Sequence, residues 1–498
     1  MQIDDECDVA ILPVAKRFKI FEASNDNEIH IIPYICTISI DCLAPIIEFV
    51  DTAFMIEKLY SCGSRQLNQM MQNGGVTKLV YNVNSSYFKR LFLVYERYAK
   101  NLHTLVSNFS SSQIKSFCSL LSCMTRLERL KLTCRSLNDL VIPLFPKTLT
   151  WLSLSQTKAT HECIVDLPRS LTYLYVDFDL KDGIRHLPPE LLHLESRSTC
   201  LSKHHLALLP RSILCLHITV NKDWNPQDLN DLASSCNDLD LPPNLTTLVL
   251  VGSDYKVNPP VHKLPLLLKT LRLSGAGLFG DFSFLPATLT SFETHYSNDG
   301  TISSSKIAQL PLELRHLDIP YLPMDHSVFG KFTFLQSLNI LQWTGLDEEI
   351  ASLPRSLTRL CFTRESHLNN AGVANLPPKL TSLDMGGKNL TDKGVALLPS
   401  GLTKLYLFLK GRRTNKALEN LPRSLTKLRM DWNNSTMTSE EGFALLPRGL
   451  TSLDFRIHQR KDDLIFRTTD LQHLPSTLTE LPNCMTLQRS WKTWKNAQ

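Results

Sequence analysis

The sequence has no long apolar run. No stretch approaches the 18 apolar residues that a membrane-spanning helix requires, so we expect no membrane association. The first residues, Met1 to Glu6, are acidic and lack the basic and then apolar segments of a signal peptide. The 13 cysteines are scattered and form no regular framework. We therefore expect a cytoplasmic protein with reduced thiols.

Neither sign of charge is in large excess. The 53 lysines and arginines and the 48 acidic residues leave a net charge of only +5 on 498 residues. Proteins that read nucleic acids usually concentrate basic residues on one face. We therefore expect no nucleic-acid partner.

Catalytic and cofactor motifs are scarce, and the few matches fail in context. The run from Gly275 to Gly280 matches a dinucleotide-binding glycine pattern, but a repeat copy follows it at once and leaves no room for the helix that would hold a pyrophosphate. His161-Glu162 begins like a zinc-protease helix but lacks the second histidine. We therefore expect no enzymatic activity, no cofactor and no metal.

What the sequence does contain is a repeated unit, Leu-Pro-x-x-Leu-Thr-x-Leu-x-apolar, seen most clearly from Leu421 to Met430. Most neighbouring prolines in these units lie 20 to 25 residues apart. A further copy opens at Phe145, and two copies without the proline begin at Leu127 and Leu335. The other copies begin at Leu167, Leu187, Leu209, Leu241, Leu264, Leu285, Leu310, Leu353, Leu376, Leu398, Leu446 and Leu474.

This unit and its period resemble the leucine-rich repeat family over residues 120 to 482. The period is too short for ankyrin, tetratricopeptide or propeller repeats. The resemblance implies an α/β fold: a curved, right-handed leucine-rich repeat solenoid over residues 75–482. Parallel strands would line its concave face, and short helices or turns its convex face.

One copy shows why the units must stack. In the strand that follows Pro422, Leu428 and Met430 point to one side, and Lys427 and Arg429 point to the other. A single copy cannot bury its apolar side alone, so neighbouring copies must share a continuous leucine core.

Two further positions recur in the copies. Asn369 and Thr391 are good helix N-cap residues, so we expect one or two helical turns after each of them on the convex side. A threonine follows the first strand leucine in many copies, as at Thr426. Its hydroxyl either bonds the backbone along the stack or simply favours extended structure, and we weigh the second explanation first.

The N-terminal part does not follow the repeat. Residues 1–37 are a mixed segment, residues 38–74 have helical apolar spacing, and residues 483–498 form a C-terminal tail. The 38–74 segment resembles an F-box, although Ile38-Ser39 replaces its opening Leu-Pro. The resemblance implies docking to a ubiquitin-ligase adaptor. We weigh first the interpretation that this segment is an N-terminal helical cap over the first coil, which is compatible with an F-box. The expected adaptor-docking residues are Ile46, Phe49, Ile56 and Leu59.

The repeat also predicts which side chains face the concave side, namely the two that flank the middle strand leucine. Exposed aromatic residues on such a face favour protein binding, although Tyr173 and Tyr175 could instead shield each other. We predict a monomeric, non-enzymatic protein-binding module, either a substrate receptor of a cullin-type ubiquitin ligase or a plain scaffold. The expected partner-binding residues are Trp151, Tyr173, Tyr175, Asp177, Glu195, Arg359, Lys404, Tyr406, Lys427 and Arg429.

Overall fold

The computed structural model divides the chain into two compact units. Unit 1 contains Met1–Val220 and Asp240–Leu245, and unit 2 contains Asn221–Leu239 and Thr246–Gln498. The boundary falls inside the solenoid predicted for residues 75–482. The structure describes residues 78–81, 102–108, 114–201, 203–220, 241–252, 264–274, 282–295, 303–319, 325–340, 343, 345–362, 368–387, 389–409, 415–432, 440–457 and 473–479.

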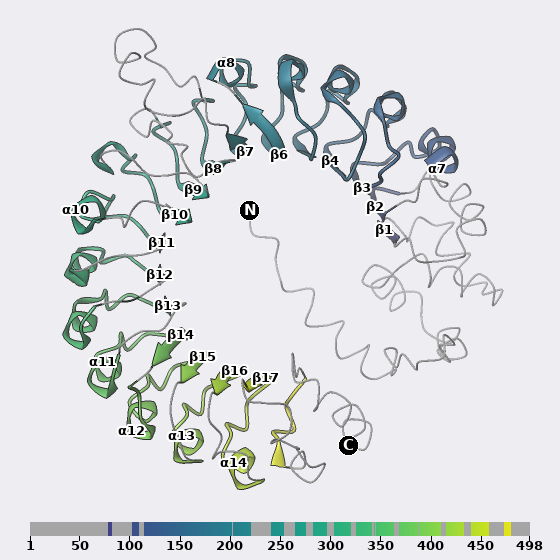
Figure 1. Ribbon diagram of the computed structural model, residues 1–498. Helices are drawn as coiled ribbons and strands as arrows, with labels where there is room; N and C mark the ends of the chain where they lie inside the picture. Colours follow the sequence, from purple (N-terminus) through teal and green to yellow (C-terminus); the bar gives the residue numbers. More distant parts are fainter. Residues whose placement is uncertain are drawn as a thin grey trace, which may run out of the picture. The chain divides into compact units, whose positions relative to one another are not determined.

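In unit 1, strands alternate with short helices, and each strand pairs in parallel with the next along the chain (Figure 1). The strands lie on the concave side of the unit, with the helices on its convex side. The elements are β1 (Lys78–Tyr81), β2 (Thr104–Asn108), α7 (Ile114–Leu121), β3 (Arg129–Thr133), η3 (Asp139–Leu144), β4 (Trp151–Ser155), η4 (His161–Asp166), β5 (Tyr173–Val176), η5 (Lys181–His186), β6 (His193–Leu201), α8 (Lys203–Leu206) and β7 (Cys215–Val220).

Unit 2 repeats this arrangement, with parallel pairing from β8 through to β17. Both units are leucine-rich repeat solenoids, as the sequence predicted. The elements of unit 2 are β8 (Thr247–Gly252), β9 (Thr270–Ser274), η9 (Phe282–Phe284), β10 (Ser291–His295), α10 (Ser304–Ile307), β11 (His316–Ile319), η10 (His326–Lys331), β12 (Ser337–Ile340), η11 (Asp347–Ser352), β13 (Arg359–Phe362), α11 (Asn370–Ala374), β14 (Ser382–Gly387), α12 (Asp392–Val395), β15 (Lys404–Leu409), α13 (Asn415–Glu419), β16 (Lys427–Trp432), α14 (Glu440–Ala444) and β17 (Ser452–Ile457).

The core of each unit is a stack of repeat leucines. In one coil the opening Leu421, the first strand leucine Leu425 and the middle strand leucine Leu428 are all buried, and Met430 joins them. Neighbouring coils stack these residues directly, since Leu405 and Leu428 are register partners in β15 and β16. The predicted alternation along the strand is therefore confirmed.

The threonines of the repeat form a hydrogen-bond ladder along the stack. The hydroxyl of Thr403 donates to the Thr381 carbonyl at 3.0 Å, and Thr426 and Thr451 repeat the bond one coil later each time, both at 3.1 Å. Each carbonyl also accepts two backbone amides, as Thr403 O does from Thr426 N and Lys427 N at 2.8 and 3.0 Å. The expectation that these threonines only favour extended structure is therefore wrong, because each hydroxyl bonds a backbone carbonyl of the preceding coil.

A second ladder runs through the turn that precedes the strands. The hydroxyl of Ser424 donates to the carbonyl of Leu402 in the previous coil. The guanidinium of Arg423 donates to the Glu419 carbonyl at the end of its own α13 at 3.0 Å, and to the Leu445 carbonyl after α14 at 2.9 Å. Arginine at this position therefore satisfies helix-end carbonyls in two adjacent coils. Arg169, Arg211, Arg355 and Arg448 make the corresponding bond to the following coil, and Arg355 and Arg448 also bond a carbonyl of their own coil.

The convex segments are short, and their caps differ from the prediction in one place. The Asn369 side chain accepts the amide of Ala371 at 2.7 Å, which confirms the predicted N-cap of α11. Thr391 precedes α12 but makes no side-chain cap bond to it. Its hydroxyl oxygen instead accepts Asn370 Nδ2 at 2.8 Å, so the side chain joins two adjacent coils.

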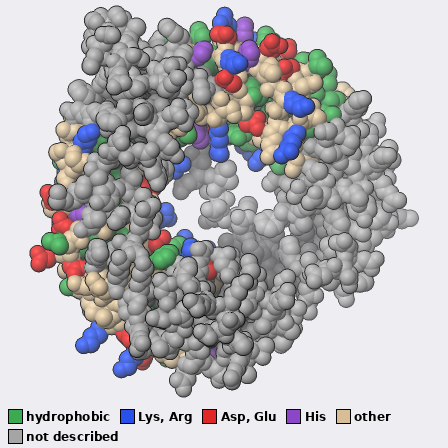
Figure 2. All heavy atoms as spheres, viewed as in Figure 1, with side chains coloured by type: hydrophobic (Ala, Val, Ile, Leu, Met, Phe, Trp, Pro, Cys, Tyr) green, Lys and Arg blue, Asp and Glu red, His purple; other side chains and the backbone are tan. Residues whose placement is uncertain are grey.

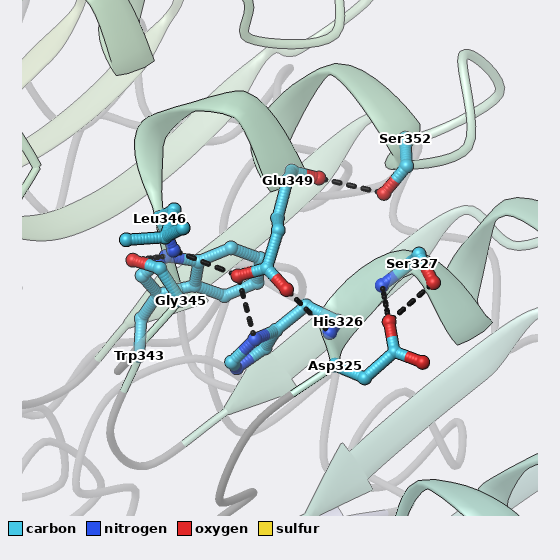
Figure 3. Close-up of polar contacts among 8 residues, drawn as sticks. All are labelled: Asp325, His326, Ser327, Trp343, Gly345, Leu346, Glu349 and Ser352. Carbon is cyan, nitrogen blue, oxygen red and sulfur yellow. Dashed lines mark hydrogen bonds and ion pairs between the residues drawn. The ribbon is translucent and has the colours of Figure 1, made fainter.

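One convex segment of unit 2 encloses a fully buried histidine (Figure 3). The His326 ring packs against Trp343 with 3.9 Å between the ring centroids and 37° between the ring planes, and its Nδ1 lies 3.4 Å from Glu349 Oε2. The Glu349 carboxylate is already engaged, since it accepts the amides of His326 and Leu346 at 3.2 and 2.7 Å. Burial lowers the pKa of His326, and the nearby Glu349 opposes that shift without overcoming it.

Candidate partner-binding surface

The strand face of unit 1 consists of the side chains that flank the middle leucine of each strand. The parallel register places Trp151, Tyr173 and His193 in one row, and Tyr175, Glu195 and His217 in a second row. The strands thus align residues that lie about 20 positions apart in sequence. Five of the predicted partner-binding residues therefore come together in this unit, namely Trp151, Tyr173, Tyr175, Asp177 and Glu195.

The first row is an aromatic ladder. The rings of Trp151 and Tyr173 stack with 4.7 Å between their centroids and 12° between their planes, and the rings of Tyr173 and His193 are 6.1 Å apart. Trp151, Tyr173 and Tyr175 are each only half-buried. Tyr173 thus packs against the neighbouring strands, rather than relying on Tyr175 of its own strand for cover. The rings pack against one another, and their half-buried side chains leave part of the ladder open to solvent.

Glu195 connects the two rows of unit 1. Its carboxylate accepts the Tyr173 hydroxyl at 3.5 Å and Arg197 Nε at 3.1 Å, and lies 3.3 Å from His217 Nδ1. Burial together with the Glu195 charge raises the pKa of Tyr173 to about 12. The phenol therefore stays protonated, and remains a hydrogen-bond donor, to well above neutral pH.

Asp177 lies immediately after β5 and has a structural contact of its own. Its carboxylate accepts the backbone amide of Gln156 in the preceding coil. Gln156 has a φ of 53°, a left-handed conformation that residues other than glycine rarely adopt. The carboxylate therefore stabilises a strained turn.

The strand face of unit 2 carries charges of both signs in two rows. The first row, nearer the start of the strands, holds hydroxyls and cations, and the second row holds the acids together with Arg272 and Arg429. Charged side chains of both signs are visible on the concave side of this unit (Figure 2). The first row runs Thr270, Ser291, His316, Ser337, Arg359, Ser382, Lys404, Lys427 and Ser452, and the second runs Arg272, Glu293, Asp318, Asn339, Cys361, Asp384, Tyr406, Arg429 and Asp454.

The cations of unit 2 differ in how they are held. Arg429 Nε lies 3.6 Å from the Asp454 carboxylate, and its guanidinium carbon is 6.0 Å from the centroid of the Tyr406 ring. Lys404 and Lys427 are register partners on adjacent strands, and the described acidic side chains form no ion pair with either. Lys404 is exposed and Lys427 half-exposed. These two lysines therefore present concentrated positive charge, while Arg429 is partly neutralised.

Several residues of these rows were not among the sequence predictions, although the same rule would have selected them. Arg129 and Lys131 flank the middle leucine of β3 and are exposed beside the aromatic ladder. Asp318 accepts Asn339 Nδ2 at 2.8 Å in the acidic row. The rule that the residues flanking the middle strand leucine face the concave side would have identified them, had it been applied to every copy.

Of the remaining predicted features, some lie outside the residues that the structure describes and some lie within them. Ile46, Phe49, Ile56 and Leu59 lie outside them, as does the glycine run from 275 to 280. His161-Glu162 opens η4, a 3-10 helix. In the part of the chain that the structure describes, no three His, Cys, Asp or Glu side chains gather as a metal site. Within the same ranges, no helix has both the length and the apolar character needed to cross a bilayer.

Comparisons with known proteins return similar folds only among solved structures. No protein-family model matches the sequence, and no curated protein matches it either. The chain is similar to CroV588, described as a circular LRR protein, with 17% identity over 83% of this chain and 66% of the other, and a TM-score of 0.41. It is similar to TLR13 in its complex with ssRNA13, with 16% identity over 82% and 64% and a TM-score of 0.45. It is also similar to the LRR protein LIC12759 of Leptospira interrogans, with 19% identity over 83% and 98% and a TM-score of 0.41. The chain thus spans slightly less than two thirds of the first two proteins.

Proposed function

We propose that this chain is a non-enzymatic protein-binding module that engages its partner through the strand face. The observation that supports this most is the aromatic ladder of Trp151 and Tyr173, whose rings stack on one another and are half-buried on the strand face. Large rigid side chains contribute contact area at little entropic cost, and tryptophan and tyrosine dominate binding energy in protein interfaces. Stacking along the solenoid alone would not require these residue types, since Thr104 and Cys215 occupy the same row.

The charged rows of unit 2 make a second, separate contribution to this proposal. Lys404, Lys427 and Arg359 would attract an acidic surface on a protein partner, and the attraction would weaken with salt. A polyanion such as a nucleic acid fits this face poorly, because the acidic row with Asp318, Asp384 and Asp454 runs beside the cations. A protein surface with both signs of charge matches the two rows better.

The test compares strand-face variants with matched controls on the convex side or turn edge. Proteins are captured from an extract of the source cells on wild-type protein and on two strand-face variants. These variants are Trp151→Ala/Tyr173→Ala and Lys404→Glu/Lys427→Glu. The controls are Leu144→Ala/Val165→Ala, which alters exposed convex residues of unit 1, and Lys379→Glu/Lys393→Glu, which alters exposed lysines away from the strand face.

A protein that wild type and both controls retain is then purified, and its affinity is measured directly. We expect each strand-face variant to bind it at least tenfold more weakly, with thermal melts unchanged. The aromatic change should raise the dissociation rate, and the lysine change should lower the association rate. If the controls weaken binding more than the strand-face variants do, the strand face is not the binding surface.

We further propose that the protein works as a cytoplasmic monomer, and that a ubiquitin-ligase link would reside in the F-box-like segment, 38–74. The pattern of Ile46, Phe49, Ile56 and Leu59 supports this link at the sequence level. We expect the full chain to bind a purified ligase adaptor, and Ile46→Glu/Phe49→Glu to abolish that binding without lowering the melting temperature. If wild type does not bind the adaptor, the link is wrong and the plain scaffold remains.

A further inference from the structure

The turn that leads into each strand has a repeating chemistry. Counting back from the first strand residue, positions −4 and −3 carry polar side chains in most coils. In the coils of β5, β13 and β16 these positions hold Arg-Ser, and both side chains bond backbone carbonyls. This edge of the solenoid is therefore polar and serves the stacking of the coils.

In one part of unit 2 the same edge becomes apolar. Leu266 and Leu267 occupy both positions before β9, Leu312 occupies −4 before β11, and Phe334 occupies −3 before β12. Ala287 fills position −4 in the coil between them. The exposed fractions of the four large side chains are 80%, 51%, 56% and 52%, respectively.

The strand register places these residues along one edge, with Leu266 and Leu312 in the row at −4 and Leu267 and Phe334 in the row at −3. Thr270, Ser291, His316 and Ser337 are successive register partners, so residues at equal distances before them lie in line. With about 4.8 Å between neighbouring strands, the four coils span about 14 Å. We refer to Leu266, Leu267, Leu312 and Phe334 as the edge patch.

The core does not need these side chains. The first strand leucines of the same coils, Leu268, Leu314 and Leu335, are fully buried immediately beside them. Single exposed leucines are ordinary on protein surfaces, but a contiguous apolar patch usually marks a contact. The edge patch is therefore a surface feature that folding does not account for.

We propose that the edge patch binds a short amphipathic helix of a partner protein, with acidic residues beside its apolar stripe. Two to three turns of helix are about 11–16 Å long, which matches the 14 Å of the patch. Lys269 and Arg315 are exposed between the patch and the strand face, and would pair with the acids. Glu313 is exposed within the same edge, so it sets the register of the bound helix by repelling an acid placed opposite it.

Size and charge argue against a second copy of this chain as the occupant. Four such side chains expose of the order of 400 Å², whereas a stable interface buries about 800 Å² per partner. A two-fold contact through the patch would also bring Lys269 and Arg315 of both copies close together, where like charges repel. A narrow helix avoids both difficulties.

The experiment uses the full-length protein and a displayed library of helical peptides as the probe. Peptides are selected for binding to wild type and counter-selected against Leu266→Ser/Leu312→Ser/Phe334→Ser, and the enriched peptides are synthesised. We expect apolar residues at i, i+4 and i+7 flanked by Asp and Glu. Fluorescence anisotropy should show at least tenfold weaker binding to the triple variant. Leu140→Ser/Val165→Ser, which changes exposed apolar residues of unit 1, should bind like wild type.

A charge exchange separates this helix from a generic apolar ligand. Lys269→Glu/Arg315→Glu should bind the acidic peptide at least fivefold more weakly and prefer a version with lysine in place of the acids. Equal affinity of wild type for both versions would overturn the acidic assignment. Failure to enrich any peptide would overturn the proposed site. If wild type sediments as a dimer and the triple variant sediments as a monomer, the patch is a self-association surface instead. These outcomes are independent of strand-face binding.

Discussion

Replacing the ladder threonines with valine tests whether their hydroxyls stabilise the stack. Thr403, Thr426 and Thr451 donate to the preceding coil at 3.0, 3.1 and 3.1 Å, and all three side chains are half-buried. Valine keeps the shape and the preference for extended structure, so the main loss in Thr→Val is the hydrogen bond, and the added methyl group can only reduce the net cost. The triple variant Thr403→Val/Thr426→Val/Thr451→Val therefore isolates the contribution of the ladder.

The expected cost follows from the geometry. A net hydrogen bond contributes about 0.5–1.5 kcal/mol, and half-exposed carbonyls that keep two amide donors should fall near the lower end of that range. At about 0.5–1 kcal/mol per site, three sites give about 1.5–3 kcal/mol. We expect the urea midpoint of unit 2 to fall accordingly, followed by circular dichroism, with little change in slope.

Two outcomes decide the reasoning. A single Thr403→Val variant should lower the midpoint by about a third of the triple effect. If the triple variant unfolds at the wild-type midpoint or above it, the hydroxyls contribute nothing, and the threonines serve only as strand formers.

Two further predictions concern the convex side. A Cβ at Gly183 would lie 2.4 Å from the backbone oxygen of His161, so Gly183→Ala should destabilise unit 1 by about 1–3 kcal/mol in thermal melts. The control is Gly401→Ala, which should be neutral in the same melts because the nearest atom to its added Cβ is 3.7 Å away. Burial lowers the pKa of His326 in the folded state, so the unfolded chain binds the proton more tightly. The contribution of neutral His326 to the free energy of unfolding is therefore complete above about pH 6.5. It is lost as the pH falls below that value, by up to about 1.4 kcal/mol per pH unit. The urea midpoint of wild type should thus fall more between pH 7 and 5 than that of His326→Gln, and parallel pH profiles would contradict the assignment.

The sequence predicted the solenoid because its information is periodic. One template of leucines, repeated every 20 to 25 residues, determines which side chains are buried, and Leu383 and Leu405 occupy the core positions it assigns. The template also placed Trp151 and Tyr173 on the strand face, because side-chain direction alternates along a strand.

Details that depend on distances between coils could not be predicted in this way. The stacking of Trp151 on Tyr173, the contacts of Glu195 with Tyr173 and His217, and the bond from Arg423 to the Leu445 carbonyl all join residues of different coils. The recurrence of Arg-Ser after Leu-Pro was visible in the sequence, but its role became clear only once the helix-end carbonyls were located. Likewise, the burial of His326 depends on Trp343 and Glu349 from the following coil.

Site-specific photo-crosslinking tests the central claim most directly, because it reports which face touches the partner. Benzoylphenylalanine is introduced in the full-length protein at Tyr175 on the strand face and, as a control, at the exposed Glu162 on the convex side of the same unit. After irradiation in source-cell extract, adducts are identified by mass spectrometry. We predict a specific protein adduct from position 175, lost when Trp151→Ala/Tyr173→Ala is added, and none from position 162. Specific adducts from position 162 alone would contradict the claim that the strand face binds the partner.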